Sequence, residues 1–166
     1  MIRLREVTEK DGPFLFELYA DTRAEEISTF GWGEAERNVF LKMQYAAQKH
    51  SYLHQYPRAV HQIVMYNETP VGRMIKDMTE DAYLLVDVSL HSDFQNQGIG
   101  TFLIRNLQNS AEREHKKVRL HVLGHNPARQ LYDRLGFRLI GESFPYITME
   151  WRHAESSYHI QRSNDK

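Results

Sequence analysis

The stretch from Tyr83 to Leu123 constrains the fold of this chain more than any other part of it. It opens with the nearly continuous apolar run Tyr83–Leu90, which is typical of a buried central strand. The loop Gln95–Gly100 follows, then a helix predicted by the apolar spacing from Ile99 to Ala111, and then a second strand at Val118–Leu123. Two strands joined by a helix of this length form a right-handed parallel crossover.

The patterns on both sides of this crossover predict strands and helices that complete one domain. Thr8 and Asp11 resemble a helix cap, and Asn126-Pro127 resembles another, with Gly136 ending the helix that it starts. The predicted elements are a strand at 2–7, helices from about residue 10 and over 34–54, a hairpin of 60–66 and 71–78, a helix at 128–135, and closing strands at 137–140 and 146–151. We therefore expect a single α/β domain over residues 1–152, followed by a polar tail at 153–166. Its sheet should be mixed and mostly antiparallel, with flanking helices and one parallel crossover at its centre.

Composition excludes several classes of function. Lys plus Arg number 21 against 22 Asp plus Glu, so charge gives no reason to expect a nucleic acid or an anionic membrane as partner. There is no cysteine, and the nine histidines show no metal-ligand spacing, so we expect no metal site. The opening residues lack the apolar core of a signal peptide, and no run of about 18 apolar residues occurs. We expect a cytoplasmic protein.

The loop Gln95–Gly100 is a candidate anion site. It joins a buried strand to a helix, so its amides and the positive end of that helix converge on one point. The plain alternative is a strand-to-helix turn that needs glycine only for its backbone conformation. A Rossmann fold would place such a loop after the first strand, and a Walker A loop would end in Gly-Lys-Ser or Gly-Lys-Thr, so neither pattern applies.

The segment after the crossover narrows the choice. Downstream of the loop come the strand Val118–Leu123, Asn126 with Ala128, and the pattern Leu131-Tyr132-x-x-x-Gly136-Phe137. In this order and at these spacings, the sequence from about residue 2 to 151 resembles the GNAT superfamily of acetyl-CoA-dependent N-acetyltransferases. The resemblance implies a cofactor, acetyl-CoA or CoA, and a reaction in which a primary amine attacks the thioester directly.

The resemblance also implies roles for particular residues. Tyr132 would protonate the departing thiolate, which suits a phenol with an ordinary pKa of about 10; simple ring packing is its alternative role. Asn126 could equally be only a helix cap. The implied cofactor-binding residues are Val88, Ser89 and Leu90 along the strand edge for pantetheine, Gln95, Asn96, Gln97, Gly98, Ile99, Gly100 and Thr101 for the pyrophosphate, and Asn126, Ala128 and Tyr132 on the following helix.

Three possibilities remain for the general base: His121, Asp87 or a water relay. Alternation in the strand puts His121 on the face opposite Val118 and Val122, where it could accept a proton or be an ordinary strand histidine. Asp87 interrupts an apolar strand and could orient His121 or bind a cationic amine. Candidate residues for the acceptor pocket are Glu25, Glu26, Phe30, Trp32 and Tyr146.

The sequence leaves the acceptor amine unidentified, small molecule or peptide. It also leaves the oligomeric state open, a homodimer included. A non-catalytic module that binds or senses acyl-CoA on the same fold is the alternative function.

Overall fold

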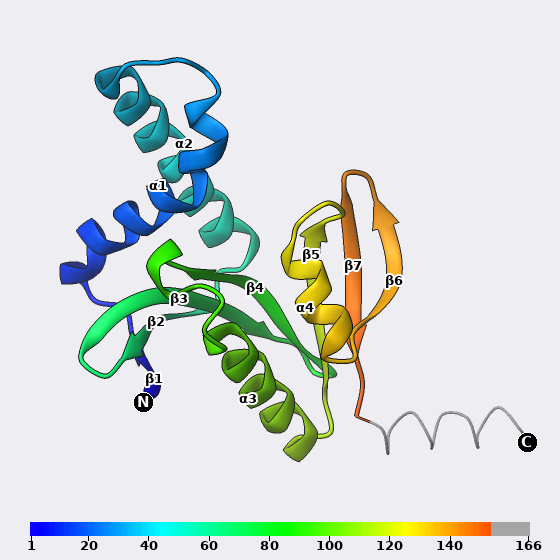
Figure 1. Cartoon of the computed structure of the whole chain (residues 1–166). Coiled ribbons are helices and arrows are strands. Elements are labelled where there is room, and N and C mark those ends of the chain that lie inside the picture. The colour runs from blue at the N-terminus through cyan, green and yellow to red at the C-terminus, as the bar shows by residue number, and fades with distance from the viewer. Residues whose placement is uncertain (154–166) are drawn as a thin grey trace, which may run out of the picture. The chain divides into compact units, whose positions relative to one another are not determined.

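The seven strands of the computed structural model, which describes residues 1–153, are hydrogen-bonded in the order β1-β2-β3-β4-β5-β7-β6 (Figure 1). The pairs β1–β2, β5–β7 and β6–β7 are antiparallel, whereas β4–β5 is parallel. The predicted mixed sheet with one parallel crossover and flanking helices is therefore confirmed. The strands are β1 (Ile2–Glu6), β2 (Val60–Tyr66), β3 (Thr69–Met78), β4 (Ala82–Leu90), β5 (Lys117–Leu123), β6 (Arg138–Ser143) and β7 (Tyr146–Trp151).

The helices also follow the sequence pattern. Asp11 and Thr8 form the predicted capping box, in which the Thr8 amide donates to Asp11 Oδ2 at 2.8 Å. Asn126 Oδ1 accepts from the Ala128 amide at 2.9 Å, so Asn126 caps its helix as predicted. The helical elements are η1 (Glu9–Asp11), α1 (Gly12–Ser28), α2 (Glu34–Gln55), η2 (Ser92–Phe94), α3 (Ile99–Arg113) and α4 (Ala128–Arg134).

The structure differs from the predicted elements at element ends and in the short helix η2, which the sequence pattern did not predict. Pro70 belongs to β3 and not to the preceding turn, so the hairpin loop is shorter than the sequence indicated. Strand β6 runs to Ser143, beyond the predicted end at Ile140, because pairing with β7 extends it to the tight connection between them. Of the predicted tail, His153 is described, and its Nε2 lies 2.7 Å from Glu112 Oε1. Residues 154–166 lie outside the described part of the chain.

The described chain divides into two compact units, and each is described by itself. The N-terminal unit comprises Met1–Ile75 and Asp87–Gln97, and the C-terminal unit comprises Lys76–Val86 and residues 98 onward. Strands β3 and β4 each contribute to both units. The prediction of one domain over residues 1–152 stays a prediction.

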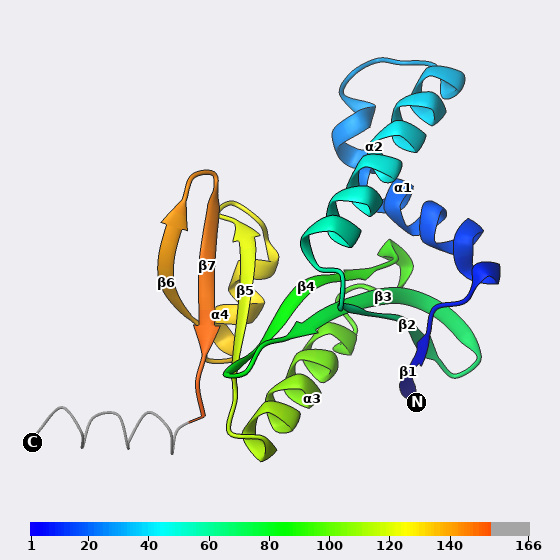
Figure 2. The same ribbon diagram turned by 180° about the vertical axis from the view of Figure 1, so that it is seen from behind.

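In the N-terminal unit, α1 and α2 lie on the same face of β2 and β3 (Figures 1 and 2). Buried apolar side chains of the two strands, Ile63 and Ile75 among them, are at most 5% exposed. A second cluster of Tyr19, Ile27 and Leu41 joins the two helices to each other. Burial of these side chains supplies the main stabilisation, at roughly 25 cal/mol per Å² of apolar surface.

In the C-terminal unit, α3 contacts β5, and α4 follows β5 along the chain (Figure 1). The apolar stripe of α3 is buried through Ile99, Leu103 and Ile104, and the alternating residues Val118 and Leu120 of β5 are also buried. Within residues 1–153, every helix is too short or too polar to span a bilayer.

Candidate active site

The connection from β4 to α3 has the backbone of an anion-binding loop. Asn96 and Gly98 both adopt positive φ angles, 61° and 83°, which turn the chain sharply before α3 begins. Gly98 is the N-cap of α3, and an added Cβ would meet nothing within 4 Å, so its glycine is required by conformation and not by crowding. The loop therefore presents backbone without a covering side chain at the helix start.

Two glutamine side chains brace this loop. Gln95 Nε2 donates to the Leu90 carbonyl at 2.9 Å, and Gln97 Nε2 donates to the Asp93 carbonyl at 3.1 Å. These bonds hold both side chains against the loop, and the backbone N–H groups at the start of α3 are the further donors that an anion here would meet. The first helical bond of α3 is donated by the Phe102 amide to the Gly98 carbonyl at 3.0 Å, so the preceding amides of the first turn have no partner within the helix.

Strand β4 carries the residues expected to bind the pantetheine arm. Its parallel ladder with β5 pairs residues 82–85 with 117–120 and ends there, although β4 itself runs on to Leu90. Val88, Ser89 and Leu90 lie in this later part and are each partly exposed. On its other side the strand end is held to β3, because the His91 amide donates to the Val71 carbonyl at 2.8 Å.

Asp87 lies in a polar cluster that the sequence did not reveal. Its Oδ2 accepts from Arg73 Nε of β3 at 2.7 Å, and its Oδ1 accepts from Ser89 Oγ at 3.1 Å. A second nitrogen of Arg73 donates to Gln48 Oε1 of α2 at 2.8 Å. The side chains of Arg73 and Asp87 are only 12% and 19% exposed, so this ion pair lies largely out of water.

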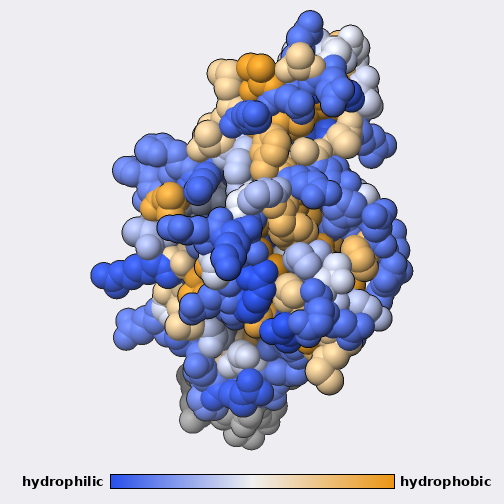
Figure 3. All heavy atoms as spheres, turned by 90° about the vertical axis from the view of Figure 1, so that its left-hand side faces the viewer, coloured by the Kyte–Doolittle hydropathy of each residue, from blue (hydrophilic) through white to orange (hydrophobic). Residues whose placement is uncertain are grey.

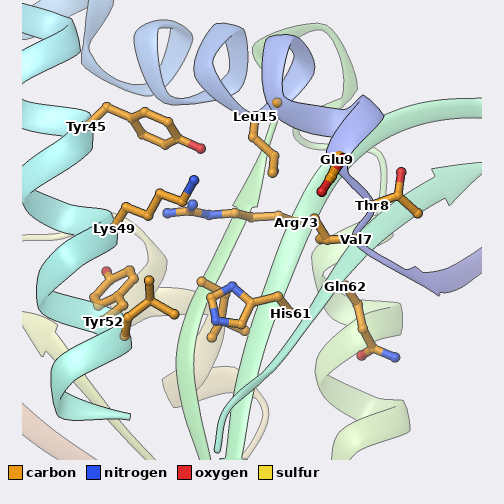
Figure 4. A pocket seen from close by; sticks show the side chains of 13 residues that line it. Val7, Thr8, Glu9, Leu15, Tyr45, Lys49, Tyr52, His61, Gln62 and Arg73 are labelled. Atoms are coloured by element: carbon orange, nitrogen blue, oxygen red, sulfur yellow. The ribbon is translucent and has the colours of Figure 1, made fainter. Parts of the chain in front are cut away.

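A cavity of about 250 Å³ opens beside this cluster within the N-terminal unit. The close-up in Figure 4 shows Lys49 of α2 and Arg73 of β3 pointing toward one another across it, with Glu9 on another wall. The polar side chains that line the cavity include Tyr45, Lys49, Tyr52, His61, Gln62 and Arg73.

Burial and the ion pair change the titration of the cavity side chains. Burial raises the pKa of the Tyr52 phenol to about 12, and Asp87 adds to the rise while Arg73 opposes it. Burial lowers the pKa of His61, and the charge of Arg73 lowers it further. The cavity therefore presents a neutral phenol and a neutral imidazole at physiological pH.

The C-terminal unit holds the proposed acid and its neighbours. Tyr132 of α4 is 5% exposed, and its ring centroid lies 5.6 Å from that of Phe137. Asn126 and Ala128 meet at the start of the same helix through the capping bond, and both are partly buried. Asn126, Ala128 and Tyr132 are therefore positioned by α4 and the residue that caps it.

His121 lies on the exposed face of β5, as the alternation predicted. Val118, Leu120 and Val122 are buried on the other face. The His121 Nδ1 is 2.8 Å from Thr148 Oγ1 of the adjacent strand β7, which orients the ring and leaves Nε2 for another partner. The hydrogen-bonded partners of Asp87 are Arg73 and Ser89, so the structure assigns these two candidates to separate hydrogen-bonded clusters.

The predicted acceptor residues of the N-terminal unit gather around the turn between α1 and α2. Phe30 and Trp32 are 46% and 38% exposed. Their rings are tilted against each other, and each ring also packs edge-on against the ring of Phe40. Figure 3 shows apolar atoms exposed among polar ones at this end. Glu25 and Glu26 are exposed on α1, and Glu26 Oε2 lies 3.6 Å from Arg23. None of these residues lines the cavity described above.

Tyr146, the remaining acceptor candidate, begins β7 in the C-terminal unit and is 51% exposed. The residues that sequence reasoning missed are those of the cavity, above all Arg73. One signal was available, because Arg73 interrupts an apolar strand as Asp87 does, with the opposite charge. Within residues 1–153, no group of three or more metal-ligating side chains could hold a metal ion.

Solved structures share this fold. The PaiA N-acetyltransferase of Thermoplasma acidophilum, crystallised in complex with coenzyme A, has a TM-score of 0.70 at 15% identity, covering 92% of this chain and 99% of that one. An acetyltransferase of Thermus thermophilus has a TM-score of 0.65 at 19% identity, covering 92% and 97%. The ribosomal-protein-S18-alanine N-acetyltransferase of Escherichia coli has 0.60 at 18%, covering 92% and 94%.

Sequence comparison gives the family. No curated protein gives a significant match to the chain. The family model for the acetyltransferase (GNAT) domain matches residues 57–139, which is half of the sequence and includes the β4–α3 loop, β5 and α4. On this match the chain belongs to the GNAT family of acetyltransferases.

Proposed function

We propose that this chain is an N-acetyltransferase that moves an acetyl group from acetyl-CoA to a primary amine by direct attack on the thioester. The observation that carries the proposal is the β4–α3 loop, whose side chains brace it and whose backbone amides stay available at a helix start. Membership of the GNAT family and the coenzyme A complex of the PaiA enzyme support the choice of cofactor.

The residues present fit this cofactor. The amides of residues 96–101 can donate hydrogen bonds to a pyrophosphate, since Gly98 leaves open space where a side chain would stand. The Gln95 amide itself donates to the Ser92 carbonyl at 3.4 Å. Beyond Leu85 the edge of β4 has no ladder partner among the described strands on the β5 side, and we assign its Val88–Leu90 backbone to the amide groups of pantetheine. Bound there, acetyl-CoA supplies an activated acyl group.

Each candidate catalytic residue then has a role that its surroundings support. We assign Tyr132, a buried tyrosine of α4, as the acid that protonates the leaving sulfur, because a phenol with an ordinary pKa of about 10 is a suitable proton donor to a thiolate. His121 is the proton acceptor, through the Nε2 that its bond to Thr148 leaves available. Asp87 is already paired with Arg73, so we assign it to positioning that guanidinium and not to proton transfer.

Replacing Tyr132 by phenylalanine tests the proposal. The variant should still bind CoA, within about tenfold of the wild-type affinity by calorimetry because only one hydroxyl is lost, while amine-dependent CoA release falls by about a hundredfold or more, in the range of general-acid catalysis. Tyr66→Phe, at an exposed tyrosine on β2, is the matched control and should behave as the wild type. A wild-type chain that binds CoA but releases none from acetyl-CoA with any amine would indicate a sensing module instead.

A further inference from the structure

The second half of α2 turns an unusual face toward the sheet. Tyr45, Gln48, Lys49 and Tyr52 follow one another at helical spacing, and each lines the cavity or bonds to Arg73. A helix normally buries an apolar stripe against a sheet. Here Val39 and Met43 of the same helix are 61% and 68% exposed, while the stripe that faces β2 and β3 is polar. A few polar side chains that converge on a cavity with apolar and aromatic walls are typical of a ligand site.

The charges on this surface do not cancel locally. Arg73 is neutralised by Asp87, but Lys49 has no ion pair or hydrogen bond among the described residues. Glu9 is the carboxylate that lines the cavity itself, and among the described residues it makes no ion pair with Lys49. Lys49 and Arg73 therefore place two cations against one paired carboxylate at the α2 side of the cavity (Figure 4).

Arg73 is also held in position with donors to spare. A guanidinium has five N–H groups, and the described residues engage two of them, Nε with Asp87 and one at Nη2 with Gln48. These two bonds and the ring of Tyr52, 6.0 Å from the guanidinium carbon, fix the plane of the group. A single oxyanion in the cavity can therefore accept hydrogen bonds from three groups: the remaining N–H groups of Arg73, the Lys49 ammonium and the Tyr45 hydroxyl.

We propose that the cavity binds the carboxylate of the acceptor, and hence that the acceptor is an amine of about amino-acid size that carries a carboxylate. This inference rests on the proposed acetyltransferase function. The size of the acceptor follows from the cavity volume, because about 250 Å³ lies below the roughly 300–1,000 Å³ of sites for drug-sized ligands. The cavity adjoins β4 through the Arg73–Asp87 pair, and Asp87 directly precedes the strand edge assigned to pantetheine.

Pairs of amines that differ only by a carboxylate test this assignment. The substrates are tyrosine and tyramine, arginine and agmatine, lysine and cadaverine, and glycine and methylamine, each assayed for CoA release from acetyl-CoA. We expect the carboxylated member of at least one pair to have a kcat/KM at least tenfold higher. In Lys49→Met that ratio should fall by about tenfold, the effect of one charge-assisted bond. Lys49→Arg should keep it.

The control is Lys42→Met, at an exposed lysine of α2 that does not line the cavity, and it should keep the wild-type ratio. Turnover that favours the decarboxylated amines, or a ratio unchanged in Lys49→Met, overturns the inference and leaves the enzyme intact. So does a preference for phosphoethanolamine over every carboxylated amine.

Calorimetry separates this failure from failure of the proposed function. If no amine yields CoA, the acetyltransferase proposal fails. Titration of the same amino acids into the chain then decides the carboxylate site by itself. Binding of the acids that is at least tenfold tighter than that of their decarboxylated partners, and that weakens in Lys49→Met, supports the site. Equal or absent binding contradicts it.

Discussion

Replacing Gly72 by alanine should disturb the strand edge that we assign to pantetheine, and the structure sets the size of the effect. A Cβ at Gly72 would stand 2.2 Å from the Ser89 carbonyl oxygen and 2.8 Å from Leu90 Cδ2. Since real Cβ contacts essentially never fall below 3.0 Å, β3 and the end of β4 must separate by about 0.8 Å. The contact is with backbone, so a side-chain rotation cannot relieve it.

Two costs follow from this separation. Overpacking of a buried site costs about 1–3 kcal/mol, and weakening the His91–Val71 backbone bond adds about 1 kcal/mol. We therefore expect a loss of about 2–4 kcal/mol in the free energy of unfolding, with a Tm roughly 5–15 °C lower for a chain of this size. Affinity for CoA should also fall, because Ser89 and Leu90 move.

Urea denaturation followed by far-UV circular dichroism, together with calorimetric titration of CoA, measures both effects. Gly33→Ala is the matched control, because Gly33 has a negative φ of −73° and its added Cβ meets nothing within 4 Å. That variant should keep the wild-type affinity for CoA and lose no more than about 1 kcal/mol of stability, since alanine would replace glycine at the N-cap of α2. A Gly72→Ala protein with wild-type stability and CoA affinity would refute the assigned closeness of β3 and β4.

Two further variants test the first cap and the loop. In Asp11→Asn, loss of a buried carboxylate bonded to Arg5 at 2.8 and 2.9 Å should cost about 2 kcal/mol at pH 7 by urea denaturation. Bonds from Arg5 and Thr8 hold the pKa of Asp11 far below its ordinary value, so its contribution is complete above about pH 4 and is lost as the pH falls further; a difference between variant and wild type that does not shrink in acid would contradict this. In Gln95→Ala, loss of the brace to Leu90 should weaken CoA binding by about three- to tenfold in calorimetry, whereas Gln44→Ala on α2 should not, and equal affinities would show that the brace is unimportant.

Most of the fold was predictable because its signals are local. The capping bonds of Thr8 with Asp11 and of Asn126 with Ala128 depend on residues two or three positions apart, which a sequence pattern displays directly. The alternation in β5 likewise placed His121 on the exposed face. Pro70 was misplaced because a proline at the start of a strand and one in a turn look the same without knowledge of the pairing.

The candidate site was harder to predict from the sequence, because its key contacts join residues that are far apart along the chain. Arg73 meets Asp87 and Gln48 across separations of 14 and 25 residues, and no local pattern encodes which partner a charge in a strand will find. The sequence therefore left Asp87 as a base or an amine ligand, although its oxygens are bonded to Arg73 and Ser89. No local pattern distinguished Lys49 from other lysines, since a lysine on a helix is ordinarily solvated.

The most direct test of the account is to incubate the wild-type chain with acetyl-CoA, with and without the amine panel, and to follow free thiol release and product mass. The account predicts release that requires an amine and an equal amount of amine carrying one added acetyl group. Thiol release that is absent with every amine, or that proceeds equally without any amine, would contradict it.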